Sequence, residues 1–389
     1  MILSNKPFFS ILLPTKNRSE VVGNAILSVL NQSYINFELI VSDNDDPDLA
    51  ATYTVVNGFK DSRIKYFRTS GDLSMPDNWN NALSKASGIY VTVLQDKQIY
   101  HEGALDSLHQ NLISQREIEV ITFQSDMSVL INKDEFIFNN NNKDNLWAES
   151  SQVILSDLVK YGPFSIWNRL PRMINSCVSH ELIKRTSKTT NLPSFFIDVT
   201  PDLSASFIQL AMTKTIYHMD ASLVISTSTK LSGGMAVRKR SQSGESFFNG
   251  VSKQGDICSL VQIKNRHVVS NLIVNDYLNV REILRGKLEV FIFSNENYLK
   301  IYLNDVARNF SEGYFFIDTI KDAHSVINKY PFLFRVRMYT YFLLMFVRCL
   351  VVTIKNFIKR YFQLFLDRIT GKNAIMTIHQ FLDNVKKCK

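Results

Sequence analysis

Short apolar runs alternate with amphipathic segments through the first 125 residues of this chain, and that order constrains the fold strongly. Phe8–Leu13 is an apolar run ending at Pro14, the pattern of a strand buried on both faces. Apolar residues follow at helical spacing over Val21–Leu30, and Phe37–Val41 is predicted as a second strand. A strand, a helix and a strand within about 35 residues predict a parallel pair joined by a right-handed crossover.

The same alternation continues further along the chain. We predict strands over Ile64–Phe67, Ile89–Leu94 and Val120–Phe123, and helices over Pro76–Ala86 and Gly103–Gln115. Elements that alternate in this way predict an α/β sheet layered by helices. Additional helices are expected over 151–161, 203–213 and much of 255–310.

Polar residues follow three of the predicted strands at the point where each strand ends. These strand ends carry Thr15–Arg18, Asp43–Asp46 and Gln95–Gln98. In open α/β sheets, ligands bind beyond the carboxyl ends of the strands. The sequence therefore predicts a binding site at one edge of the sheet.

Charge and cysteine content narrow the class of protein. The net charge is +8, but Lys329–Lys389 holds twelve Lys or Arg and two acids, so the rest of the chain is slightly acidic. The main body is therefore not expected to bind nucleic acid. The four cysteines have no metal-type spacing, which argues against a zinc site or a disulfide framework and fits a reducing compartment. A cleavable signal peptide is not expected.

Two stretches resemble the start of family 2 glycosyltransferases: FSILLPTKNRSEVVGNAILSVLNQSYINFELIVSDNDD and NWNNALSKASGIYVTVLQDKQIYHEGAL. They show strand, turn, helix and acidic strand end in the family's order. The resemblance implies the A-type glycosyltransferase fold, a Rossmann-like mixed α/β sheet flanked by helices, here with a helical C-terminal extension. It also implies transfer of a sugar from a nucleotide-diphosphate sugar to an acceptor hydroxyl, mostly with inversion.

The resemblance implies donor-binding roles at the first two strand ends. Asp43 matches the family position that meets the nucleotide base, whose N–H would otherwise be buried unpaired, and Asn44 follows it. The turn from Pro14 and Thr15 to Arg18 precedes a helix N-terminus and suits contact with nucleoside or phosphate. The alternative is that Asp43 and Asn44 only cap the end of their strand.

The turn after the fourth strand departs from the family's pattern. The family usually has an acidic triplet there that holds Mg²⁺ or Mn²⁺ against the diphosphate. In Gln95–Gln98 only Asp96 is acidic, and it is the candidate metal ligand. Asp96 could hold the cation together with phosphates and waters, or Lys97 could neutralise the diphosphate directly. The third alternative is a site that binds the donor but does not catalyse transfer.

An inverting transferase also needs a base for the proton of the acceptor hydroxyl. Asp202 precedes an apolar helical run, LSASFIQLA, and matches the family's base in general layout. An acid in the first turn also stabilises a helix dipole, which is the simpler alternative. Asp198 is the second candidate for the base.

A basic glycine-containing stretch, Lys230–Arg240, has two interpretations. Such a loop can close over a bound diphosphate. The alternative is an ordinary surface loop, and the stretch does not fit a Walker-type phosphate loop.

The C-terminal region, 331–369, is basic and rich in aromatic and aliphatic residues. Arg337, Arg348, Lys355 and Lys359 are spaced to share one helical face. This pattern predicts an interfacial helix on an anionic membrane. The longest uncharged run, Met338–Val347, is much shorter than the roughly 20 residues that span a bilayer. Packing on the catalytic domain, or on a second subunit in a homo-oligomer, is the alternative.

These observations predict a glycosyltransferase domain over 1–235, with a nucleotide-sugar half (1–125) and an acceptor half (126–235). A helical extension over 236–330 and a membrane-associating tail over 331–389 follow. The resemblance implies synthesis of bacterial surface polysaccharide or lipopolysaccharide on a glycan or lipid-linked acceptor, at the cytoplasmic face of the membrane.

Three rival functions remain open at this level. A non-catalytic homologue that binds nucleotide sugar is favoured by the single acid at Gln95–Gln98. A membrane scaffold would use the tail as its functional part. A nucleotidyltransferase usually has a glycine-rich loop after its first strand, and Pro14–Arg18 contains no glycine.

Overall fold

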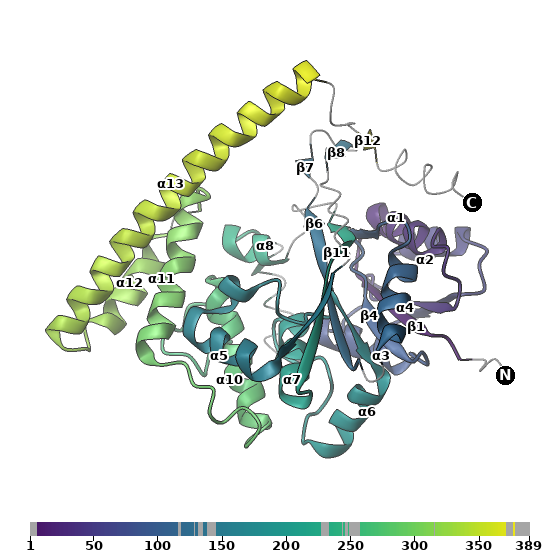
Figure 1. Ribbon diagram of the computed structural model, residues 1–389, viewed down its shortest axis with the longest axis horizontal. Helices are drawn as coiled ribbons and strands as arrows, with labels where there is room; N and C mark the ends of the chain where they lie inside the picture. Colours follow the sequence, from purple (N-terminus) through teal and green to yellow (C-terminus); the bar gives the residue numbers. More distant parts are fainter. Residues whose placement is uncertain are drawn as a thin grey trace.

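A nine-stranded mixed sheet forms the centre of the protein in the computed structural model (Figure 1). The structure describes residues 6–115, 118–127, 129–130, 135–137, 145–226, 233–242, 244–245, 248, 257–314, 316–370 and 376–377. Eight strands follow the order β3-β2-β1-β4-β10-β6-β11-β5, and β9 pairs with β11. The predicted mixed α/β sheet is confirmed.

Four parallel strands make up the first half of the sheet, and all four were predicted. They are β1 (Phe9–Thr15), β2 (Phe37–Asp43), β3 (Ile64–Arg68) and β4 (Tyr90–Val93). The connections carry α1 (Ser19–Leu30), α2 (Ala51–Gly58) and α3 (Met75–Ser84). Helix α3 begins with Pro76 in its first turn, and the Ser74 hydroxyl accepts from the Asp77 amide.

The second half of the sheet changes direction at a short inserted strand. Strand β10 (Ser176–Ser179) is antiparallel to both of its neighbours, β4 and β6 (Val120–Met127). Strand β11 (Thr215–Ser226) runs parallel to β6, and β5 (Gln98–Tyr100) and β9 (Leu146–Ser150) pair antiparallel with β11. The remaining short strands form a separate sheet of β7 (Val129–Leu130), β8 (Glu135–Ile137) and β12 (Met376–Thr377).

Two apolar clusters cover the two faces of the main sheet. In β1, the side chains of Phe9, Ile11 and Leu13 pack with α1, α2 and α4 (Ala104–Ser114), whereas Leu12 belongs to the opposite cluster. That opposite face is covered by α3, α5 (Ser151–Tyr161), α6 (His180–Thr189) and α7 (Pro201–Met212). All four β1 side chains are fully buried, as the apolar run predicted.

The helical extension packs directly against this second face. It contains α10 (Val269–Ile283), α11 (Asn295–Ser311) and α12 (Ile317–Ile327), and Tyr277 of α10 stacks edge-on against Phe207 of α7 at 5.2 Å. Residues of α10 therefore share one core with the sheet.

The basic stretch Lys230–Arg240 is partly helical. Residues 230–232 lie outside the described part of the chain, and Gly233–Lys239 forms α8. The Arg238 guanidinium binds the buried carboxylate of Asp305 in α11 at 3.1 Å. This ion pair attaches α8 to the helical extension.

The predicted C-terminal helix is confirmed as α13 (Phe332–Thr370), the long helix at the left of Figure 1. Its first half packs against α11, with the rings of Phe346 and Phe310 4.3 Å apart. Within the described residues, Phe332–Lys355 is long and apolar enough to cross a membrane, with a mean hydropathy of 1.6. This segment is longer than the uncharged run Met338–Val347 because it also includes isolated basic residues, such as Arg337 and Arg348. These residues leave the segment apolar on average.

Candidate active site

The carboxyl ends of β1, β2 and β4 lie together because these strands are parallel neighbours. Thr15 and Asp43 are direct register partners, and Pro14 pairs with Ser42 inside the two strands. The Asn44 amide donates to the Thr15 carbonyl at 3.0 Å. The polar residues predicted at the first two strand ends are therefore adjacent.

Asp43 and Asn44 are both buried and both engaged in hydrogen bonds. Oδ2 of Asp43 accepts from the Tyr66 hydroxyl at 2.6 Å and from Arg68 Nη1 at 2.8 Å, and its Oδ1 accepts from a backbone amide. Oδ1 of Asn44 accepts from the Thr69 hydroxyl at 2.6 Å. A nucleotide base that paired with Asp43 would therefore share its Oδ2 with the donors of Tyr66 and Arg68 in β3.

Asp96 lies in the turn after β4 and is held by the turn after β1. Its Oδ1 accepts from Arg18 Nη1 at 3.0 Å, and its Oδ2 accepts from the Thr15 hydroxyl at 3.1 Å. Only 4% of Asp96 is exposed. Three residues predicted to bind the donor are thus brought into direct contact.

Lys97, in the turn after β4, and Asp202, in the first turn of α7, are electrostatic neighbours. Burial, and then the charge of Arg18, lowers the pKa of Lys97 to about 8. The carboxylates of Asp96 and Asp202 act on Lys97 in the opposite direction. The predicted base in the first turn of α7 is therefore an electrostatic neighbour of the turn after β4.

Arg172 is a member of this cluster that the sequence did not reveal. It is 7% exposed, and its guanidinium lies 4.0 Å from the ring centroid of Trp167. Burial lowers the pKa of Arg172 to about 10, and the Asp202 carboxylate opposes that shift. Arg172 lies just before β10, a strand with no clear sequence signal, so no pattern connected it with the strand ends.

The electrostatic setting of Asp202 suits a proton acceptor. Burial raises the pKa of Asp202 above its usual 3.8, although Arg172, the amides of Asp202 and Leu203, and Lys97 oppose the shift. A carboxylate with a raised pKa is a stronger base than a free aspartate.

Asp198, the second candidate for the base, instead supports the segment that leads to Asp202. Its Oδ1 accepts from Asn279 of α10 at 2.5 Å, and its backbone is left-handed, with φ of +64°. Asp276 of α10 accepts from the Thr200 amide at 2.7 Å. Burial raises the pKa of Asp198 to about 6, and burial together with Asp198 raises that of Asp276. Asp198 and Asp276 are thus electrostatic neighbours, and their hydrogen bonds link the residues just before Asp202 to α10.

The turn after β4 does not fit a divalent cation. A divalent cation held against a diphosphate still needs one or two protein carboxylates whose oxygens are available to it. Asp96 already accepts from Thr15 and Arg18, and Gln98 Oε1 accepts from the Gln95 amide at 3.0 Å to close the turn. Among the described residues, no group of three or more His, Cys, Asp or Glu side chains is arranged to hold a metal.

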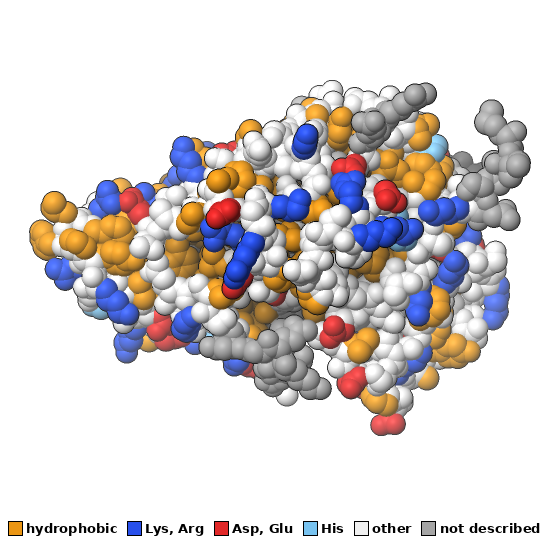
Figure 2. Space-filling view, turned by 90° about the horizontal axis from the view of Figure 1, so that it is seen from below, with side chains coloured by type: hydrophobic (Ala, Val, Ile, Leu, Met, Phe, Trp, Pro, Cys, Tyr) orange, Lys and Arg blue, Asp and Glu red, His pale blue; other side chains and the backbone are white. Residues whose placement is uncertain are grey.

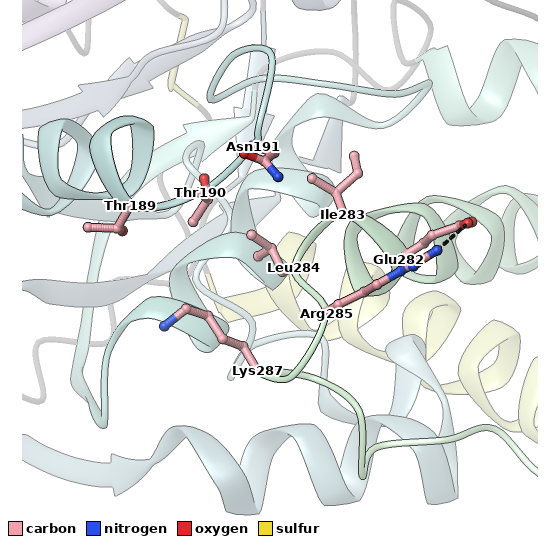
Figure 3. Close-up of a pocket in the computed structure, with 8 residues that line it drawn as sticks. All are labelled: Thr189, Thr190, Asn191, Glu282, Ile283, Leu284, Arg285 and Lys287. Atoms are coloured by element: carbon pink, nitrogen blue, oxygen red, sulfur yellow. Dashed lines mark hydrogen bonds and ion pairs between the residues drawn. The ribbon is translucent and has the colours of Figure 1, made fainter.

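A surface cavity of about 500 Å³ lies elsewhere, between the C-terminal ends of α6 and α10 (Figure 3). None of the predicted site residues lines it. Glu282 and Arg285 pair with each other at its rim, at 3.4 Å. We therefore assign the candidate site to the strand ends and not to this cavity.

Comparison with known proteins points to the same part of the chain. Residues 10–150 match the model of glycosyl transferase family 2. A GalNAc(5)-diNAcBac-PP-undecaprenol beta-1,3-glucosyltransferase of Campylobacter jejuni is 40% identical over 107 residues, which are 27% of this chain and 34% of the relative. The Escherichia coli UDP-Glc:alpha-D-GlcNAc-diphosphoundecaprenol beta-1,3-glucosyltransferase WfgD is 35% identical over 97 residues, or 25% and 38% of the two chains.

The matched segments thus span little more than a third of these two relatives. Among solved structures, Staphylococcus aureus TarS 1–349 in complex with UDP covers 90% of this chain and 91% of its own, at 13% identity and a TM-score of 0.45, which supports no assignment. The family match covers the region that contains Asp43 and Asp96. Residues 10–150 of this chain are thus similar to glycosyl transferase family 2.

Proposed function

We propose that this protein transfers a sugar from a nucleotide-diphosphate sugar to an acceptor hydroxyl, with inversion, in the synthesis of a bacterial surface glycan. The nucleotide lies over the ends of β1 and β2, near Thr15 and Asp43, in the half formed by residues 1–125. Residues 126–235 supply the acceptor side, 236–330 brace it, and 331–389 attach the enzyme to the membrane. Arg18, Asp96 and Lys97 lie at the diphosphate.

One observation carries this proposal: the Asp202 carboxylate is an electrostatic neighbour of Lys97, in the turn after β4. Asp202 interacts electrostatically with Lys97 and Arg172, although about 105 residues separate Lys97 from it in the chain. In an inverting transfer the base and the leaving diphosphate lie on opposite sides of the sugar carbon. A base near, but distinct from, the phosphate-binding cations meets that requirement.

The relatives support a lipid-linked acceptor. Both are named as beta-1,3-glucosyltransferases, and both names include an undecaprenol diphosphate. An acceptor anchored in this way lies at a membrane, which agrees with the basic C-terminal helix.

A turnover assay tests the function. The full-length protein is incubated with UDP-, GDP- and dTDP-sugars and an undecaprenyl-diphosphate-linked sugar, and released nucleotide and glycolipid product are measured. We expect one donor to give acceptor-dependent nucleotide release. Binding of a donor with no product from any donor would favour the alternative of a non-catalytic nucleotide-sugar-binding protein, for which the single acid of the Gln95–Gln98 turn is the specific support.

Helix α13 supports attachment to a membrane. An apolar stripe containing Leu333, Leu343 and Val347 is 50–80% exposed, at helical spacing. Arg337 and Arg348 border it on one side, and Arg337 also binds Glu296 of α11. Figure 2 shows hydrophobic side chains gathered at the end of the molecule where α13 begins. An apolar stripe edged by cations fits the interface of an anionic bilayer at the cytoplasmic face.

Charges placed in this stripe should release the protein from membranes. We expect the double variant Leu343→Glu and Val347→Glu to lower binding to vesicles containing phosphatidylglycerol by at least about tenfold, because each buried carboxylate opposes insertion. Sedimentation with vesicles measures the effect. The matched control, Val290→Glu with Ile292→Glu, changes two exposed apolar residues outside α13 and should bind as wild type does. If wild type ignores vesicles and instead forms dimers that the α13 variant dissociates, a second subunit covers the stripe.

A further inference from the structure

The part of the candidate site assigned to the diphosphate contains more cations than carboxylates. Arg18 pairs with Asp96, and Lys97 and Arg172 are electrostatic neighbours of Asp202, so these five side chains carry a net positive charge before any ligand binds. We propose that this protein binds the diphosphate of its donor without a divalent cation, and that Lys97 and Arg172, with Arg18, take the place of the metal. The inference rests on the proposed function and specifies how its donor is held.

Asp96 acts in this arrangement as a positioning residue. Its two oxygens accept from Arg18 at 3.0 Å and from Thr15 at 3.1 Å, so the carboxylate fixes the guanidinium at the strand ends. The Arg18 side chain remains one-third exposed, and a guanidinium can bind a phosphate through two parallel hydrogen bonds. An acid that would serve as a metal ligand elsewhere thus orients a phosphate-binding arginine here.

Arg172 is an independent indication of an anionic ligand. More than nine-tenths of the residue is buried, and its Nε has no hydrogen-bond partner among the described residues. Within the part of the chain that the structure describes, no carboxylate lies at ion-pair distance from it. Trp167 holds the guanidinium plane at 4.0 Å. A buried guanidinium without a bound anion is unfavourable, and phosphate oxygens would supply the missing acceptors.

Electrostatics disfavours a cation in the same place. A divalent ion beside Asp96 would be repelled by Arg18 and Lys97 and would have to displace the hydrogen bonds that Asp96 already accepts. Gln98 does not replace a carboxylate in the shell of such an ion, because its Oε1 already accepts from the Gln95 amide to close the turn. A diphosphate, by contrast, is attracted by all three cations.

The transfer step then needs no metal. The acceptor oxygen forms a bond to the anomeric carbon while the bond from that carbon to the diphosphate oxygen breaks. The acceptor proton passes to the Asp202 carboxylate, and the electron pair of the broken bond remains on the departing nucleoside diphosphate. Lys97 and Arg172 stabilise the charge that develops there.

A binding experiment with the full-length protein tests the inference. UDP, GDP and dTDP, with the matching nucleosides, are titrated calorimetrically in excess EDTA and again in Mn²⁺ or Mg²⁺. We expect the preferred diphosphate to bind with dissociation constants that agree within about twofold under the three conditions. Binding that is at least about tenfold tighter with metal would overturn the inference and leave the proposed function intact. If no diphosphate binds under any condition, both fall.

Variants separate phosphate recognition from folding. Lys97→Met, and separately Arg172→Gln, should weaken binding of the diphosphate by at least about tenfold and leave binding of the nucleoside unchanged. The matched control is Lys287→Met, at the rim of the distant cavity in Figure 3, which should bind as wild type does. Diphosphate affinity that persists in both Lys97→Met and Arg172→Gln would contradict the assignment of these cations.

Discussion

Asp202→Asn should lower the turnover number by roughly 10²–10⁴-fold, the usual contribution of a general base. Asparagine has nearly the same shape and keeps a carbonyl oxygen for the amides at the start of α7, so the helix should begin as before. Donor affinity should change by no more than about threefold, because the cations that hold the diphosphate remain. Turnover and donor binding, measured on the same preparation, check both parts.

The matched control for this variant is Asp198→Asn. Asparagine at 198 can still accept from Asn279 and favours the left-handed backbone found there, so transfer should continue at a rate close to that of wild type. If Asp198→Asn abolishes transfer and Asp202→Asn does not, the base is Asp198.

The pH profile gives a second check on Asp202. The base acts in its ionised form, and burial raises its pKa in the folded protein. The ratio kcat/KM of the wild type should therefore fall as pH decreases through a value above the usual 3.8 of aspartate. The residual activity of Asp202→Asn should lack this acidic decline.

Glu38→Ala should lower the free energy of unfolding by about 3–5 kcal/mol, because it removes a buried charge with several partners. Glu38 is 2% exposed, and its Oε1 accepts from the Ser10 hydroxyl at 2.5 Å and from the Ser87 amide at 2.6 Å. The same oxygen lies 3.2 Å from the Gly88 amide, and Lys65 donates to the other oxygen. The carboxylate thus joins β1, β2, β3 and the turn before β4. Its loss leaves several buried donors unpaired.

Urea unfolding at several pH values measures this effect. Burial alone would raise the pKa of Glu38, but hydrogen bonds from Lys65, Ser10 and Ser87 outweigh it and hold the pKa below 4.5. The stability that Glu38 contributes is therefore present above that value and is lost as pH falls through the lower folded pKa. The difference between wild type and Glu38→Ala should narrow in acid. Glu20→Ala, at an exposed site in the first turn of α1, should cost less than about 1 kcal/mol.

Local pattern was enough to predict the parallel half of the sheet. The apolar β1 and the helical spacing of α1 are signals that a few neighbouring residues carry, and the helix predicted over 151–161 coincides with α5. Strand β10 could not be predicted, because Ser176–Ser179 is short and is defined by pairing with β4 and β6, which are far away in sequence. Strand β11 was also missed, since register shifts interrupt its alternation.

The residues of the candidate site also differ in whether local sequence pattern could predict them. Thr15, Arg18 and Asp96 follow strands that the sequence reveals, so their meeting could be predicted from the parallel order. The donors from Tyr66 and Arg68 to Asp43 could not, because side-chain pairing across strands leaves no periodic trace. Arg172 escaped notice because it precedes β10 and only the folded chain places it near Asp202.

The antiparallel position of β10 has a consequence for synthesis of the chain on the ribosome. Strands β4 and β6 lie on either side of β10, yet β6 ends at Met127 and β10 begins at Ser176. At about 5–20 residues per second, the growing chain carries two open sheet edges for roughly 2–10 seconds. Open edges of this kind are templates for pairing between chains. We therefore expect a nascent polypeptide of this protein to be prone to pairing between chains over that interval, and a fragment that stops at residue 150 to aggregate.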